Sequence, residues 1–306
     1  MKKATMKDIA RLANVSVATV SYVLNNVANQ TIPENTRSLV LNIAKELNYI
    51  PNLAARSLIK RKSGLVGILV NKENNPPYWK SFSYHSFVER LEKHLTAAGY
   101  HTLLISMNAS HPSLDVIVER KLDAVFLIDV KDEMFYNISS KFTEGIPLIL
   151  LDSLIEDKLF NHIIFDYRTA IIEATKKVGH STALVMENFN NKALVQEIQL
   201  ASGLPAENIF VAESIEGLEQ FVNNVTFENI IVLNEFIGNY IYQTKKFNKV
   251  VVICTCHYPE ILPESIDKII YEDDRSTLAF DLMKKLISVT HSKPFKDNKF
   301  LIEVVK

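Results

Sequence analysis

Apolar residues recur every three or four positions through the first fifty residues, a spacing that predicts three short helices. Thr5 is a suitable N-cap for the first helix and Ser16 for the second, which we expect over residues 17–24. The third helix is expected to begin at Pro33, because proline is favoured in the first helical turn. The positions that would face the core of this bundle are Met6, Ile9, Ala10, Ala13, Val20, Val23, Leu24, Thr36, Val40, Ile43, Ala44 and Leu47.

From Gly64 onward the pattern changes to short apolar runs that alternate with helical segments. This alternation is typical of a parallel sheet that is covered by helices on both faces. The runs form two sets, which predicts two lobes with a ligand cleft at the carboxyl ends of the strands. The first set comprises residues 65–70, 81–98, 100–106, 112–119, 124–128 and 147–151, and the second comprises 169–178, 182–186, 194–201, 209–212, 230–233 and 250–254.

Composition bounds the class of protein and its compartment. The chain of 306 residues is long enough for two or three folding units, and no apolar run approaches the ~20 residues of a membrane-spanning helix. The basic start has no apolar stretch after it, so we expect no signal peptide and a cytoplasmic protein. The two cysteines, Cys254 and Cys256, are expected to be buried strand thiols rather than a disulfide or a metal site.

Charge is distributed unevenly along the chain. Residues 1–62 hold ten basic and three acidic side chains, whereas the remainder holds 24 basic and 32 acidic ones. A basic head on an acidic body is expected when only the head meets a polyanion. A basic surface without a partner would give the same counts, so charge alone leaves both interpretations open.

The outer face of the second predicted helix carries candidate contacts to DNA. A helix, a tight turn and a second helix with small polar residues outside form the helix-turn-helix layout. In a major groove, this outer face would meet base edges, and Ser16 and Thr19 would meet phosphates. A three-helix bundle with no role in DNA binding has the same periodicity. The outer-face residues are Val17, Ala18, Ser21, Tyr22 and Asn25.

Two segments resemble the lactose/galactose repressor family of transcription regulators. Residues 6–21, MKDIARLANVSVATVS, are similar to the opening signature of that family, and residues 48–58, NYIPNLAARSL, are similar to its hinge. The resemblance implies DNA binding by the head. It also implies that the hinge folds when two chains meet over the minor groove. Leu58 would then be an apolar wedge between base pairs, beside Asn52 and Ala55, although an ordinary linker would also contain such residues.

The head departs from the family at one base-reading position. The family often has arginine where this chain has Tyr22, and tyrosine cannot read guanine in bidentate fashion. We therefore expect an operator that differs from the family's usual sequence. Thr5 and Tyr49 complete the set of predicted DNA contacts.

The resemblance extends more weakly to the body and implies a periplasmic-binding-protein-like fold. The expected domains are a head over 1–50, a hinge over 51–62 and a body over 63–306. Lobe one would comprise about 63–162 and 275–306, and lobe two about 163–274. Crossings between lobes are expected near 160–164, 235–240 and 271–275, after which a helix near 276–289 and a strand near 300–305 return to lobe one.

Several side chains at predicted strand ends are candidate ligands for a small molecule. Tyr78 and Trp79 follow the first strand, where aromatic rings stack on sugars in the family, although a half-buried loop aromatic is the simpler interpretation. The polar candidates are Asp129, Asp152, Asp166, Arg168 and Asn234, each of which could also be a helix cap or loop residue.

The predicted cleft also departs from the family in several segments. The family's usual Asn-Asp pair is Asn234-Glu235 here, its Gly-Phe-Asp-Asp is residues 254–257, and residues 188–194 lack the usual arginine. These changes remove many sugar-binding groups, so we expect either an atypical effector or a sensing function that has weakened or been lost.

These observations together predict a transcription regulator that represses carbohydrate-related genes. It would bind a palindromic operator as a homodimer and respond to a sugar or sugar phosphate in the cleft. The alternative is a body that only dimerises or docks a co-regulator protein. No nucleotide-loop, zinc-protease or nucleophile-elbow motif is found, so we expect neither an enzyme nor a cofactor, and no membrane partner.

Overall fold

The structure is a computed structural model that describes residues 4–24, 32–49, 62–108, 120–142, 145–272, 275–288 and 297–305. The chain divides into two compact units, Met1–Ser63 and Gly64–Lys306. Four predicted DNA contacts and one predicted helix, 112–119, lie outside the described residues. The four contacts are Asn25, Asn52, Ala55 and Leu58.

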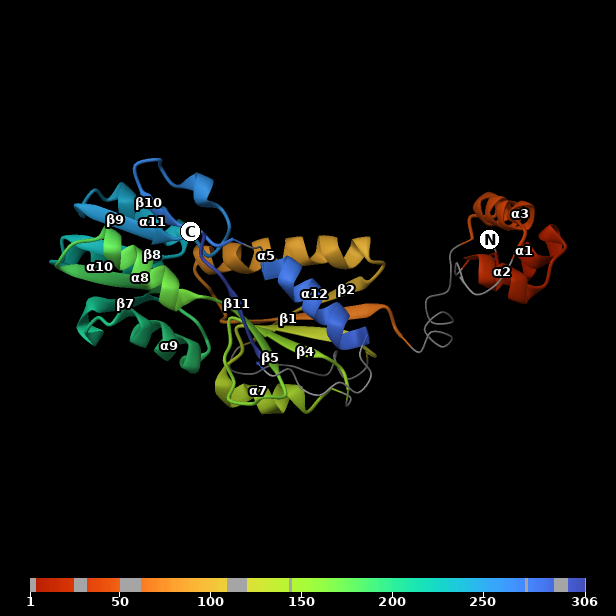
Figure 1. The fold of residues 1–306 in the computed structure, drawn as a ribbon, viewed down its shortest axis with the longest axis horizontal. Helices are drawn as coiled ribbons and strands as arrows, with labels where there is room; N and C mark the ends of the chain where they lie inside the picture. The colour runs from red at the N-terminus through yellow and green to blue at the C-terminus, as the bar shows by residue number, and fades with distance from the viewer. Residues whose placement is uncertain are drawn as a thin grey trace. The chain divides into compact units, whose positions relative to one another are not determined.

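The first unit is a bundle of three helices, as the periodicity predicts (Figure 1). Thr5 caps the first helix through a capping box, in which its hydroxyl accepts from the Asp8 amide and its own amide donates to the Asp8 carboxylate. Asn14 ends that helix with a φ of 49°, a left-handed conformation that asparagine tolerates. The helices are α1 (Met6–Ala13), α2 (Val17–Leu24) and α3 (Glu34–Glu46).

The second unit contains two sheets whose paired strands are parallel. The expected two-lobed α/β body is therefore confirmed. The first sheet has the order β11-β5-β4-β3-β1-β2, with β1 (Leu65–Lys72), β2 (His101–Asn108), β3 (Ala124–Ile128), β4 (Leu148–Leu151), β5 (Asn161–Phe165) and β11 (Lys299–Ile302). The second has the order β10-β9-β8-β6-β7, with β6 (Thr182–Glu187), β7 (Ile209–Ala212), β8 (Asn229–Leu233), β9 (Lys249–Ile253) and β10 (Asp267–Ile269).

Helices cover both faces of each sheet, which is why the strands read as uninterrupted apolar runs. In Figure 1, α5 and α12 lie together on one face of the first sheet and α7 lies on the other. One buried cluster runs from the first sheet into the second, so the lobes share a core. The helices of the body are α5 (Tyr78–Ala97), α7 (Asp132–Ser139), α8 (Tyr167–Lys177), α9 (Lys192–Ser202), η1 (Ala206–Asn208), α10 (Ile215–Asn224), α11 (Glu235–Gln243), η2 (Pro259–Ile261) and α12 (Arg275–Ser288).

The sheets correct two of the expected crossings between lobes. β5 lies wholly in the first sheet, so the chain leaves lobe one after Phe165 rather than near 160–164. The crossing expected near 235–240 is wrong, because β8 and β9 are neighbours in the second sheet and α11 packs on both. The return near 271–275 is found, since α12 packs on α5 and β11 pairs with β5.

Gly238 allows α11 to approach β9 closely. A Cβ atom built at this position would lie 2.6 Å from Val252 Cγ2. We expect Gly238→Ala to destabilise the body by about 1–3 kcal/mol, as overpacking of a filled core does, despite the better helix propensity of alanine. Urea denaturation of the single variants and of Gly238→Ala/Val252→Ala measures this effect. The second substitution should recover part of the loss, whereas strictly additive losses would show that the two sites do not clash.

Candidate functional sites

The first candidate site is the outer face of α2. The core of the bundle takes Val20 and Val23, which leaves Val17 and Tyr22 exposed on the opposite side. Ala18 is also exposed, and Ser21 is half-buried. The exposed side chains of Val17 and Tyr22 are available for contact with base edges.

Polar groups at the start of α2 are preorganised. Ser16 Oγ accepts from the Thr19 amide at 3.0 Å and lies 2.9 Å from Thr19 Oγ1, so Ser16 caps the helix as predicted. The helix N-terminus and both hydroxyls lie together at the exposed end, an arrangement that suits a phosphate. Thr5 is exposed at the start of α1, whereas Tyr49 packs against the core of the bundle.

The Ser16 cap gives a direct test of the local stability of α2. We expect Ser16→Ala to cost about 1 kcal/mol of helix stability, because the Thr19 amide loses its acceptor. Hydrogen exchange of the amides in residues 17–24 of the full chain should accelerate several-fold. Ser16→Asp is the matched control, since aspartate is an equally good N-cap. Unchanged exchange in Ser16→Ala would show that the cap contributes nothing, and equal acceleration in both variants would show that the lost acceptor is not the cause.

The second candidate site lies where the strands of the two lobes end. Asp129 follows β3, Asp152 follows β4 and Asn234 follows β8, and all three are buried with positive φ values of 55°, 50° and 90°. Such backbone conformations cost free energy and persist only where surrounding contacts fix them. The three side chains are therefore held in place by the polar network around them.

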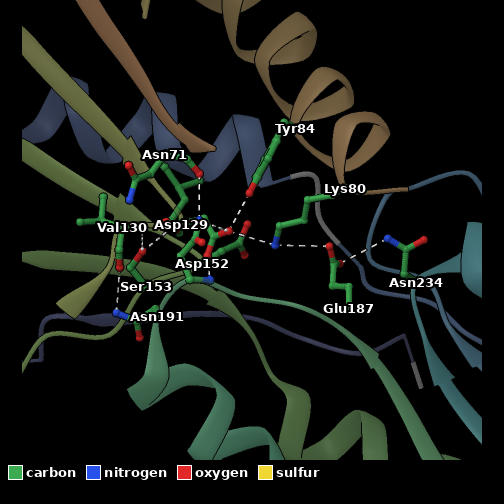
Figure 2. Close-up of polar contacts among 12 residues, drawn as sticks. Asn71, Lys80, Tyr84, Asp129, Val130, Asp152, Ser153, Glu187, Asn191 and Asn234 are labelled. Atoms are coloured by element: carbon green, nitrogen blue, oxygen red, sulfur yellow. Dashed lines mark hydrogen bonds and ion pairs between the residues drawn. The ribbon is translucent and has the colours of Figure 1, made fainter. Parts of the chain in front are cut away.

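A buried lysine is at the centre of this network (Figure 2). Lys80 Nζ lies 3.0 Å from Asp129 Oδ2 and 3.6 Å from Glu187 Oε2, and Glu187 accepts a hydrogen bond from Asn234. Tyr84 donates to Asp129 at 2.6 Å. Burial by itself lowers the pKa of Lys80, but the carboxylates of Asp129 and Glu187 outweigh it and raise that pKa above its usual value. Lys80 is therefore a buried cation.

Two asparagines of lobe two, Asn190 and Asn191, form hydrogen bonds with lobe one. The Asn190 amide donates to Asp129 Oδ1 at 2.8 Å, and its side chain donates to the carbonyl of Asn71 and to Asp129. Asn191 caps α9 with its side-chain oxygen and donates to the carbonyls of Val130 and Leu154. The segment that lacks the family's usual arginine thus supplies hydrogen bonds between the lobes.

Two predicted aromatic ligands lie in different surroundings. Trp79 has 0% exposure and packs among apolar side chains of lobe two, while it also lines a cavity of about 150 Å³. Tyr78 is half-exposed and lines a separate hollow with Phe82 and Leu104. The residues around the cavity of Trp79 are Glu73, Asn75, Pro76, Pro77, Lys80, Tyr84, Asn188, Asn190 and Glu213.

The polar residues predicted from strand ends do not all meet. Asp129 and Asn234 share the Lys80 network, with Trp79 beside it. Asp166 caps α8 and lines a different hollow with Lys177 and Lys268, and Arg168 is exposed in another. Their place in a ligand site stays a prediction.

Lys80 and Glu187 were not among the predicted site residues, although the sequence holds a signal for one of them. Lys80 is in helical phase with the buried residues Tyr84, Phe87 and Leu91 of α5. A lysine on the apolar face of a helix calls for a buried acidic partner. Glu187 ends a buried strand, and the sequence does not show which side chain it meets.

Glu235 organises the loop that contains both cysteines. Its carboxylate accepts from the backbone amides of Thr255, Cys256 and Tyr258 at 2.8–3.0 Å. The backbone therefore turns around Glu235, and the cysteines lie beyond β9 rather than in an extended strand. Both thiols are buried and free, and burial raises the pKa of each.

The described ranges lack a metal site and a membrane-spanning helix. No group of His, Cys, Asp or Glu side chains there is arranged to hold a metal ion. No helix in the same ranges is long and apolar enough to cross a membrane.

Comparison with known proteins adds to this geometry. Residues 5–52 match the family described as "Bacterial regulatory proteins, lacI family". The chain is 30% identical over 191 residues to the "Probable HTH-type transcriptional repressor ExuR" of Bacillus subtilis (strain 168), a match that covers 60% of this chain and 54% of that protein. The matches span about half the length of the first curated relatives.

Solved structures with a similar fold include two regulators. The Lac repressor dimer bound to operator and the anti-inducer ONPF has a TM-score of 0.72 at 17% identity, and the match covers 99% of this chain and 97% of that one. The transcriptional regulator CelR-cellobiose complex has a TM-score of 0.57 at 17% identity, with coverage of 99% and 98%.

The fold defines a class, a helix-turn-helix unit combined with a periplasmic-binding-protein-like body. The resemblance found in the first segment of the sequence is confirmed, because residues 5–52 match the lacI family of bacterial regulatory proteins.

Proposed function

We propose that this protein is a sequence-specific DNA-binding transcription regulator that represses carbohydrate-related genes. The observation that carries the proposal is the lacI-family unit at residues 5–52, whose second helix exposes Val17, Ala18 and Tyr22 next to a capped N-terminus. The curated relative described above is named as a repressor, and the similar Lac repressor structure contains operator DNA.

The mode of DNA binding follows from symmetry and charge. We propose a homodimer that places two heads on a palindromic operator in the cytoplasm, since a two-fold protein reads a two-fold site. Basic side chains dominate the first 62 residues, so phosphate contacts supply a salt-dependent affinity. Recognition by α2 and by the predicted wedge at Leu58 supplies specificity.

The body is proposed to regulate rather than to catalyse. A small molecule at the interlobe site would shift the relative positions of the lobes and change operator affinity, commonly by ~1–3 kcal/mol of coupling free energy. The cavity beside Trp79 is about 150 Å³. This is smaller than the ~300–1,000 Å³ of usual ligand pockets, so a sugar-sized effector requires the lobes to separate.

Selection of binding sites from a random duplex library tests the proposal. We expect a two-fold symmetric site with a flexible central step at near-physiological salt, because the heads and hinges are paired. Repeating the selection with a pool of sugars and sugar phosphates tests modulation. Recovery of asymmetric or unrelated sequences would contradict a dimeric operator reader.

Tyr22 gives a sharper test of base reading. Tyr22→Arg should change the preferred base at one position of each half-site, because arginine adds a bidentate guanine contact that tyrosine lacks. The same selection measures the change, with Arg37→Lys on α3 as a variant expected to leave the selected sequence unaltered. If Tyr22→Arg and the unaltered protein select the same DNA sequence, Tyr22 does not contact a base.

A further inference from the structure

The surroundings of the Lys80 ammonium are those of a binding site for an organic cation. Its Nζ lies 3.0 Å from one carboxylate and 3.6 Å from another, 4.3 Å from the centroid of the Phe189 ring and 5.3 Å from that of Tyr84. Carboxylates and aromatic faces around one position are the groups that recognise ammonium ions. The protein itself occupies this position.

The two carboxylates belong to different lobes. Asp129 follows β3 of the first sheet, and Glu187 is the last residue of β6 in the second. Lys80 is supplied by the first turn of α5, which packs on the first sheet. One ammonium therefore joins lobe one to lobe two at the ends of their strands.

Neutral groups complete the shell of these carboxylates. Asp129 accepts from the Tyr84 hydroxyl and from Asn190, and Glu187 accepts from Asn234. Within the described part of the chain, Lys80 is the cation that is ion-paired with both carboxylates. Without it, two buried negative charges would face each other with neutral donors alone, which is strongly unfavourable.

We propose that the space between the lobes is a primary-ammonium site whose resident occupant is the Lys80 side chain, which holds the lobes together as an internal ligand. An external molecule that takes this position must carry an ammonium group, because a hydroxyl cannot replace the charge between two carboxylates. The description of the position as the effector site rests on the proposed function; the ammonium site does not.

Truncation and rescue test the site in the full-length protein without DNA. Lys80→Ala removes three methylenes and the ammonium, the size of n-propylammonium. We expect the melting temperature of the variant to fall by roughly 10 °C, since a buried ion pair loses its cation. Millimolar n-propylammonium chloride should restore part of the loss, whereas 1-propanol and sodium chloride should not.

Lys93 provides the matched control. It lies on the same helix, but its ion pair with Glu89 is exposed, so Lys93→Ala should change the melting temperature little and should not respond to the amine. Equal responses of Lys80→Ala to the amine and to sodium chloride, or equal responses of both variants to the amine, would overturn the proposal. Because no DNA is present, such a failure is distinct from failure of the proposed function.

A measurement on the unaltered protein remains decisive if Lys80→Ala does not fold. Acetylation with acetic anhydride, followed by peptide mass spectrometry, compares the reaction rates of the two lysines. Lys80 should react much more slowly than Lys93, because its ammonium is buried and paired. Comparable rates would show that the ammonium leaves the site readily, and the proposal would be wrong.

Discussion

A cation buried between two carboxylates constrains the whole interlobe region. Isolated charges in a protein interior are unfavourable by several kcal/mol, so Lys80 fixes Asp129 and Glu187 and thereby fixes how β3 and β6 face each other. Arg275 places a second constraint nearby, since its guanidinium donates to both oxygens of Asp152 at 2.6–2.7 Å. This pair fixes the start of α12 against the end of β4, at the point where the chain returns to lobe one.

The departures from the family pattern compensate one another. Glu235 satisfies the amides of the loop at residues 255–258, and Asn190 and Asn191 hydrogen-bond across the lobes where the family usually has an arginine-containing segment. These particular backbone groups thus find partners within the chain. The site still holds buried polar atoms without a hydrogen-bond partner among the described residues, namely both side-chain polar atoms of Asn71, Trp79 Nε1 and Glu187 Oε2.

The spacing of apolar residues predicted many of the helices and strands, because each element buries one face or both faces locally. The bounds of α2 and the caps Thr5 and Ser16 follow from the sequence, as do most strands of both sheets, whereas β5 and β10 were not predicted. The runs at 230–233 and 250–254 were both assigned to lobe two, as found, and only the crossing expected between them was wrong. The candidate site was predicted in part, since Asp129 and Asn234 belong to one polar network through Lys80 and Glu187. A position after a strand does not specify the pocket that a side chain lines, and Asp166 and Arg168 line other pockets.

The free energy of the buried ion pair limits how an effector can act on this body. Removing one partner of a buried ion pair costs about 3–5 kcal/mol, which exceeds the ~1–3 kcal/mol by which an effector commonly shifts an equilibrium. A neutral molecule that separated Lys80 from Asp129 and Glu187 would have to supply that difference from its own contacts. An effector of ordinary affinity therefore acts around an intact ion pair, or it brings an ammonium group of its own. In either case a positive charge stays between Asp129 and Glu187.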